Sequence, residues 1–285
     1  MTARSSVGVA YRAAALGKRV CSAGLGWLAW IWIAAGCSPV QPEYELTSWK
    51  LSTVPADGDR GVDRQARITL EVNHRLLPSS VTRTAVSLHS GGAMPWVDLQ
   101  LQPVLRQVWI TWRGMLDPET TYAFSVSGLV DLDGVNQPEP YRAFFRTGTQ
   151  IGGVPPAPKV DPPQVVTLFQ SRCASAGCHD REHAASGLDL SSAEGIESTA
   201  RNQTSQMFAP SDRPAPRGSL FTAAPLIIDA NAKQGDPARS YIIYKLLGDD
   251  HILGAIMPPP GEEPLQDSEI QMIADWIRAG AATRS

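Results

Sequence analysis

Apolar and polar residues alternate one by one through much of the first half of the chain, and this alternation restricts what it can fold into. Ile68, Leu70 and Val72 interleave with polar residues, and similar runs recur as far as Thr147. Because successive side chains of a strand point to opposite faces, a two-residue period is typical of strands with one buried face. Turns containing Gly, Pro and Asp separate the runs. The pattern therefore predicts an all-β sandwich over residues 42–148.

Turn and strand signatures follow one another in a recognisable order within this segment. The stretches that carry them are Pro55–Gly58, Ala66–Val81, Leu116–Tyr122, Asp131–Gly134 and Phe145–Gly148. Their order resembles that of the bacterial Ig-like domain found in S-layer proteins. The resemblance implies an Ig-like sandwich for residues 42–148.

Asp131 and Asp133, followed by Gly134, are similar to the start of a calcium-binding loop. The remaining acidic ligands of such a loop do not follow. We therefore interpret the segment as a solvated turn, in which Asp and Gly tolerate left-handed backbone conformations.

The composition changes after residue 148. Residues 149–163 are rich in Pro and Gly, which predicts a stiff linker. Beyond the linker, apolar residues recur at helical spacing. We expect one helix ahead of Cys173 and another starting at Asp236, with Pro237 in its first turn. A last helix should begin near Gln266 or Asp267 and end at Gly280.

The N-terminus has the three parts of a secretory signal peptide. An apolar run over residues 20–36 follows Lys18 and Arg19 and ends in small residues. Basic flank, apolar core and small-residue end assign residues 1–36 to a signal peptide. An uncleaved membrane anchor is the alternative, although the run is short for a span of about 20 residues. Under either interpretation, the rest of the chain faces an oxidising compartment.

A cysteine follows the small residues directly. The segment Ala34-Ala35-Gly36-Cys37 resembles the lipobox of bacterial lipoproteins, although Ala34 stands where that family prefers Leu. The resemblance implies that Cys37 becomes the acylated N-terminus of the mature protein. It also implies a lipid-anchored protein of the cell envelope, on the outer membrane and facing the periplasm or the cell surface.

The segment Cys173-Ala-Ser-Ala-Gly-Cys178-His179 carries the most specific chemistry. Attachment of a c-type haem requires two thiols and an adjacent His, usually as Cys-x-x-Cys-His. Here four residues separate the cysteines. At about 100° per residue, the two extra residues would turn Cys173 away from the helical face of Cys178. We therefore expect the segment to loop out, which the small residues 174–177 allow.

Four further segments follow in the order found in small cytochrome c domains. They are Gly187–Leu190, Gly235–Ser240, Met257–Pro259 and Trp276–Ala281. Residues 164–283 are therefore similar to such a domain, which implies an all-α cytochrome c-like fold with one haem c. The resemblance further implies that Cys173 and Cys178 hold the haem covalently. His179 and Met257 would then be the axial ligands of its iron.

The same side chains allow other chemistry. A disulfide between Cys173 and Cys178 is reasonable in an oxidising compartment. Zinc could be bound by both cysteines with His179 or His183, but no second cysteine pair completes a four-ligand site. Three side chains compete with Met257 for the distal position on iron: Met207, His183 and His251.

Charge and ligation together indicate a function class. Of the 25 Lys and Arg residues, four precede residue 38, which leaves 21 bases against 28 acids in residues 38–285. This acidic body argues against nucleic acid as a partner. An iron with His and Met as axial ligands has no open position, which favours electron transfer over enzymatic chemistry. We expect an electron-transfer protein with a protein redox partner, and not an enzyme. The competing expectation is a haem-free binding or structural lipoprotein of the envelope, closed by the Cys173–Cys178 disulfide.

The lipobox resemblance predicts where the mature chain begins. Mass spectrometry of the mature N-terminus should find acylated Cys37, and Cys37→Ser should give an unprocessed or soluble protein, because it removes the acylated thiol. Cys21→Ser changes a cysteine inside the predicted signal peptide and should leave membrane attachment intact. A mature chain that starts elsewhere would contradict the assignment.

Overall fold

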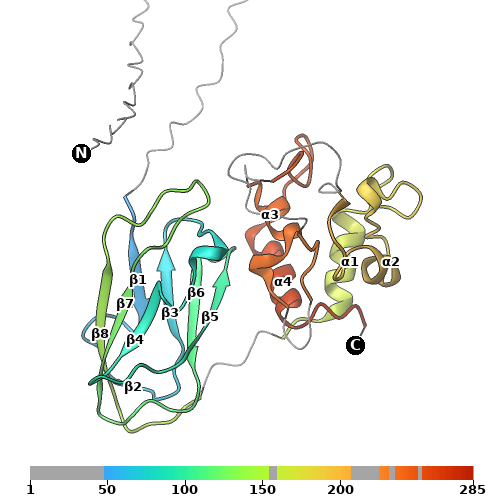
Figure 1. Ribbon diagram of the computed structural model, residues 1–285. Coiled ribbons are helices and arrows are strands. Elements are labelled where there is room, and N and C mark those ends of the chain that lie inside the picture. Colours follow the sequence, from blue (N-terminus) through green and yellow to red (C-terminus); the bar gives the residue numbers. More distant parts are fainter. Residues whose placement is uncertain (1–47, 154–158, 207–224, 231–234, 250–251, 285) are drawn as a thin grey trace, which may run out of the picture. The chain divides into compact units, whose positions relative to one another are not determined.

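The computed structural model describes residues 48–153, 159–206, 225–230, 235–249 and 252–284. Strands occupy the part of the chain before residue 148, and helices occur after residue 160 (Figure 1). The predicted signal peptide, residues 1–36, and the predicted acylation site Cys37 lie outside the described residues. Within the described ranges, no helix has the length and apolar character needed to span a membrane.

Residues 51–147 form two four-stranded sheets. The first has the order β1-β3-β6-β5 and is antiparallel throughout; its strands are β1 (Leu51–Val54), β3 (Ile68–Val72), β6 (Gln107–Trp112) and β5 (Val97–Gln102). The second has the order β2-β8-β7-β4, with β2 parallel to β8 and the other pairs antiparallel; its strands are β2 (Arg60–Val62), β8 (Tyr141–Thr147), β7 (Thr121–Val126) and β4 (Val86–His89). A short 3₁₀ turn, η1 (Pro78–Ser80), precedes β4.

The alternating pattern corresponds to the buried face of each sheet. In β7, Tyr122, Phe124 and Val126 are at most 2% exposed, whereas the residues between them are not buried. The core of the sandwich gathers such side chains from both sheets: Ile68, Leu70, Val72, Val86, Leu88, Val108, Ile110, Tyr122, Phe124, Val126 and Phe145. The predicted Ig-like sandwich is therefore confirmed.

One buried hydroxyl fixes a corner of the sandwich. The Tyr122 hydroxyl accepts a hydrogen bond of 2.9 Å from the backbone N–H of Asp117, five residues upstream. Ig-like domains use a Tyr in this way at one corner. The Thr147 hydroxyl donates to the Asp117 carbonyl at 2.6 Å, so the same turn is also tied to β8.

The C-terminal part contains four described α-helices. They are α1 (Pro162–Arg172), α2 (Ala193–Thr199), α3 (Tyr241–Leu247) and α4 (Asp267–Arg278), with 3₁₀ turns η2 (Ala185–Gly187) and η4 (Pro237–Arg239). α1 starts at Pro162, inside the predicted linker, because Pro is tolerated in the first turn of a helix. α4 begins where predicted, with a reciprocal capping box between Gln266 and Glu269.

The predicted all-α cytochrome c-like fold of residues 164–283 is wrong. The four described helices have only 11, 7, 7 and 12 residues, so the part of the chain that the structure describes is mostly β with small helices. The helix predicted from Asp236 is split. Asp236 caps only η4, and Ser240 then adopts an extended conformation before α3 begins at Tyr241. Pro-rich and polar stretches supply too little helical periodicity to extend these elements.

The small helices nevertheless share one apolar core. Val165 and Phe169 of α1 are fully buried, as are Ile273 and Trp276 of α4. The rings of Phe169 and Trp276 meet edge to face, with 5.9 Å between their centroids. This packing fixes the end of α1, where Cys173 follows.

The sandwich has a core of its own, which predicts that it folds without the C-terminal part. A fragment of residues 40–150 should unfold cooperatively in denaturant. In that fragment, Tyr122→Phe should lower the free energy of unfolding by about 0.5–1.5 kcal/mol, because it removes a part-buried hydrogen bond to the Asp117 N–H. A fragment without a cooperative transition would contradict the domain boundary.

Candidate functional site

A cavity of about 300 Å³ lies in the C-terminal part, at the lower end of the range for small-molecule sites. Cys173, Cys178, His179 and Met257 all line it. Most of the remaining wall is apolar and includes Leu188, Leu190, Ile227, Ile242 and Leu246. The structure thus brings the four predicted haem-binding residues together at one cavity. Their individual roles stay predictions.

The segment between the two cysteines loops out as expected. Cys173 ends α1, with its N–H bonded to the Phe169 carbonyl at 2.8 Å. The Cys178 N–H bonds the Ser175 carbonyl at 3.0 Å, which closes a tight turn with Gly177 in the left-handed region at φ 85°. The His179 N–H then bonds the Cys173 carbonyl at 3.2 Å. The two extra residues are therefore absorbed in a closed turn, and both cysteines still reach the cavity.

Asp180 holds the chain that follows the second cysteine. One carboxylate oxygen accepts a hydrogen bond of 2.8 Å from the Gly177 N–H. The other accepts from the N–H groups of Glu182 and His183, both at 2.8 Å. These bonds, led by the His183 N–H, hold the pKa of Asp180 well below its ordinary range. The ionised carboxylate thus stabilises both sides of the Cys178-His179 pair.

His179 is oriented by the segment Gly187–Leu190. Its Nδ1 lies 3.2 Å from the Leu188 carbonyl, and its own carbonyl accepts from the Leu190 N–H at 2.8 Å. Because a carbonyl can only accept, this bond requires the proton on Nδ1 and leaves the lone pair of Nε2 available in the neutral ring. Burial lowers the pKa of His179, which favours that neutral form. The ring is therefore prepared to act as a ligand through Nε2.

The two cysteines are free thiols in the structure. Burial raises the pKa of Cys173 to about 11, although the neighbouring Arg172 opposes the shift. At neutral pH this sulfur is therefore protonated.

Of the side chains that compete with Met257 for the distal position, only His183 lies in the described part of the chain. The His183 side chain is 54% exposed, its Nδ1 contacts Asp180 at 2.9 Å, and it does not line the cavity. Met207 and His251 lie outside the described residues. In the described part of the chain, no group of three His, Cys, Asp or Glu side chains is arranged to hold a metal ion, which disfavours the zinc site.

The Asp131 turn in the sandwich differs from its predicted solvated state. Asp131 is 3% exposed, and its carboxylate contacts His74 Nδ1 at 2.8 Å and accepts from the Val135 N–H at 2.7 Å. Both oxygens are thus engaged within the domain. Asp131 therefore stabilises the turn, and its carboxylate oxygens are poorly placed to bind calcium.

Sequence reasoning missed two polar side chains at the cavity. Tyr241 and Lys245 of α3 both line it, and both are mostly buried. Burial lowers the pKa of Lys245 and raises that of Tyr241. Their spacing of four residues places them on one face of α3, but no sequence signal identifies what that face contacts.

The residues present fit a covalently held haem. Two thiols and the imidazole of the next residue reach one cavity, which is lined mainly by apolar side chains. The Nδ1 of the imidazole bonds a backbone carbonyl, the arrangement typical of metal-binding histidines. A thioether, from Met257, also lines this cavity.

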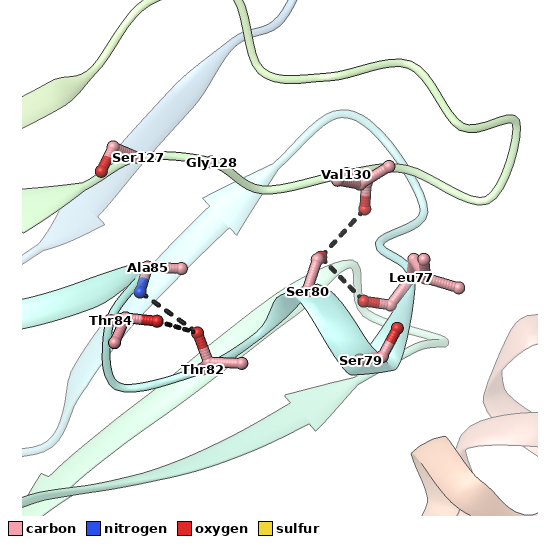
Figure 2. Close-up of a pocket in the computed structure, with 9 residues that line it drawn as sticks. All are labelled: Leu77, Ser79, Ser80, Thr82, Thr84, Ala85, Ser127, Gly128 and Val130. Carbon is pink, nitrogen blue, oxygen red and sulfur yellow. Dashed lines mark hydrogen bonds between the residues drawn. The ribbon is translucent and has the colours of Figure 1, made fainter.

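A second hollow, of about 440 Å³, lies in the sandwich beside η1. Figure 2 shows the hydroxyl groups of Ser80, Thr82 and Thr84 bonded to other residues of the same wall. The Ser80 hydroxyl donates to the carbonyls of Leu77 and Val130, at 2.8 and 3.1 Å. The Thr82 and Thr84 hydroxyls contact each other at 2.8 Å. None of the nine residues lining this hollow is titratable, so it offers no acid–base or metal chemistry.

Comparison with protein families identifies the first domain. Residues 50–147 match the family described as a bacterial Ig-like domain, which confirms the resemblance drawn from the turn signatures. The match covers less than half of the 285 residues. No curated protein matches the chain.

Solved structures resemble the chain only in part. The N-terminal part of the bacterial S-layer protein SbsC is 15% identical, with a TM-score of 0.29, over 35% of this chain and 24% of that one. A structure of domains 1–6 of SbsC is 14% identical, with a TM-score of 0.30, over 37% of this chain and 14% of that one. PcoC, a copper resistance protein from Escherichia coli, is 19% identical, with a TM-score of 0.28, over 34% of this chain and 95% of that one. The chain thus spans about a quarter or less of the S-layer structures.

The turn between the cysteines depends on Gly177. Gly177→Ala should lower the free energy of unfolding of the C-terminal part by about 1–2 kcal/mol, because a side chain is strained at positive φ. No atom lies within 4 Å of the added Cβ, so the loss would be conformational and not a clash. Gly177→Asn should cost less, since Asn tolerates this region. Equal losses for Ala and Asn in denaturant unfolding would contradict this account.

Proposed function

We propose that the protein is an electron-transfer lipoprotein of the bacterial cell envelope that carries one haem c in its C-terminal part. The observation that supports this most is the convergence of Cys173, Cys178, His179 and Met257 on one apolar cavity. A lone Cys-x4-Cys-His segment is weak evidence. Its meeting with a distant thioether, across almost 80 residues of chain, is much stronger.

Cys173 and Cys178 would hold the group covalently. Each cysteine would do so through one thioether bond. The closed turn at residues 174–177 presents both sulfurs to the same cavity despite the longer spacing.

His179, through Nε2, and Met257, through its sulfur, would hold the iron. The bond from Nδ1 to the Leu188 carbonyl fixes the ring orientation and increases the electron density on Nε2. When bound, haem c with these ligands supplies reversible one-electron chemistry, and a thioether opposite an imidazole raises its reduction potential. The apolar wall formed by Leu188 and Leu190 would limit the access of water to the iron.

The N-terminal features complete the proposal. Acylated Cys37 would anchor the mature chain to the membrane, at the outer membrane facing the periplasm or the cell surface. The bacterial Ig-like domain would then stand between this anchor and the haem-bearing part in the sequence. The redox partner would be another protein, and the acidic balance of residues 38–285 is compatible with a basic partner surface.

Haem staining after denaturing electrophoresis tests the proposal directly, because only covalently attached haem survives denaturation. The protein, expressed with a working haem-attachment system, should stain. The double variant Cys173→Ser with Cys178→Ser should not. A wild-type protein that stays unstained, with free or disulfide-bonded cysteines, would leave the haem-free envelope protein as the better description.

The distal ligand is tested separately. Met257→Ala should keep the covalent haem but lower the reduction potential and abolish the sulfur-to-iron charge-transfer band of the oxidised protein. Met272→Ala is a matched control, because Met272 is also half-buried against the same apolar core but does not line the cavity. An unchanged spectrum and potential in Met257→Ala would transfer the distal role to Met207, His183 or His251.

A further inference from the structure

We propose that Tyr241 and Lys245 of α3 are positioning residues that clamp the loop carrying Met257, so that its sulfur is held at the cavity wall before any ligand binds. The inference rests on the proposed function for the role of Met257, but the clamp itself is a property of the chain without haem. It explains why two polar side chains of α3 are buried at a cavity whose wall is mainly apolar.

Lys245 contacts the loop through both its side chain and its backbone. Its ammonium group donates to the Leu253 carbonyl and, at 2.8 Å, to the Ala255 carbonyl. Its own backbone carbonyl accepts from the Met257 N–H at 2.9 Å. Lys245 is only 7% exposed, so its charge is stabilised mainly by these carbonyl oxygens. One residue therefore binds three positions of the loop.

Tyr241 binds the same loop one helical turn earlier. Its hydroxyl donates to the Leu253 carbonyl at 3.2 Å and accepts from the Leu253 N–H at 2.9 Å. The Lys245 ammonium also lies 5.6 Å from the centroid of the Tyr241 ring. The two side chains thus act on Leu253 together, from one face of α3.

The far side of the loop is attached to α1. The Arg172 guanidinium donates to the carbonyls of Glu263 and Pro264, at 3.2 and 3.1 Å, and to the Glu263 carboxylate at 3.2 Å. Arg172 directly precedes Cys173. The loop is therefore tied at one end to the helix that leads into the cysteines and at the other to α3. Residues 254–256 are exposed, so the part of the loop directly before Met257 has little packing of its own, whereas Met257 itself packs against the apolar core.

Competition with imidazole tests the clamp in the haem-loaded protein. Imidazole can bind ferric iron only when Met257 leaves it, so a looser loop gives a lower apparent Kd. In Lys245→Leu, imidazole should bind about ten times more tightly than in the wild type, because bonds from a charged donor are lost. Tyr241→Phe should act in the same direction, and Lys245→Arg, which keeps a donor, should restore part of the wild-type Kd.

The matched control uses the same helix. Tyr244→Phe removes a buried hydroxyl that donates at 2.9 Å to the carbonyl of Ala238, a residue of η4 and not of the Met257 loop. It should destabilise the protein without changing the imidazole Kd. If the imidazole Kd shifted equally in this control and in Lys245→Leu, the effect would reflect a general loss of stability. That result would overturn the proposal.

Hydrogen exchange of the full-length, haem-free protein separates the clamp from the proposed function. The amides of Leu253 and Met257 should exchange about tenfold faster in Lys245→Leu than in the wild type, while amides of α4 keep their rates. If the wild type binds no haem but shows this difference, the function fails and the clamp stands. If the protein binds haem but neither exchange nor imidazole affinity changes in Lys245→Leu and Tyr241→Phe, the clamp fails and the function stands.

Discussion

The geometry of the cavity depends on three hydrogen bonds made by His179. Its N–H closes the loop back to Cys173, its carbonyl receives the Leu190 N–H, and its Nδ1 bonds the Leu188 carbonyl. Without these bonds the six residues from Cys173 to Cys178 would keep only their local turn and the bond to Asp180, and nothing would tie the loop to the cavity wall. With them, the cysteines, the imidazole and two wall-forming leucines become one local unit. In the sequence, the Gly187–Leu190 segment is identified only by its resemblance to a motif. In the structure, it orients the His179 ring.

The sandwich was predictable because its signal is local and repeated. A two-residue period specifies which face of each strand is buried, and successive strands such as β5 and β6 need only a short turn between them. The C-terminal fold was not predictable in the same way. The sequence does indicate α1 and α4, where the apolar spacing is regular. Between them, the helix predicted from Asp236 is interrupted at Ser240. The Asp236 side chain caps only the short turn η4, and Ser240 is extended before α3 begins.

In the candidate site, too, some residues could be predicted from the sequence and others could not. Cys173, Cys178 and His179 could be found because they belong to one short segment whose residue types indicate haem attachment. Met257 could be selected only through the order of the surrounding motifs, since a single Met carries no signal. Tyr241 and Lys245 could not be found at all. Their bonds run to carbonyls eight to twelve residues away in an irregular loop, and backbone acceptors leave no trace in the side-chain pattern.

The small size of the helices gives covalent attachment a particular value under the proposed function. Helices of 7 to 12 residues enclose little apolar volume, and the cavity interrupts their packing where an interior would normally be filled. A flat apolar group in that space would restore the missing contacts. Two thioether bonds would keep it at high effective concentration, so that both axial ligations become intramolecular. The bond to a thioether then needs only a loop held in place, and the contacts of α3 with residues 253–257 are of the kind that holds it.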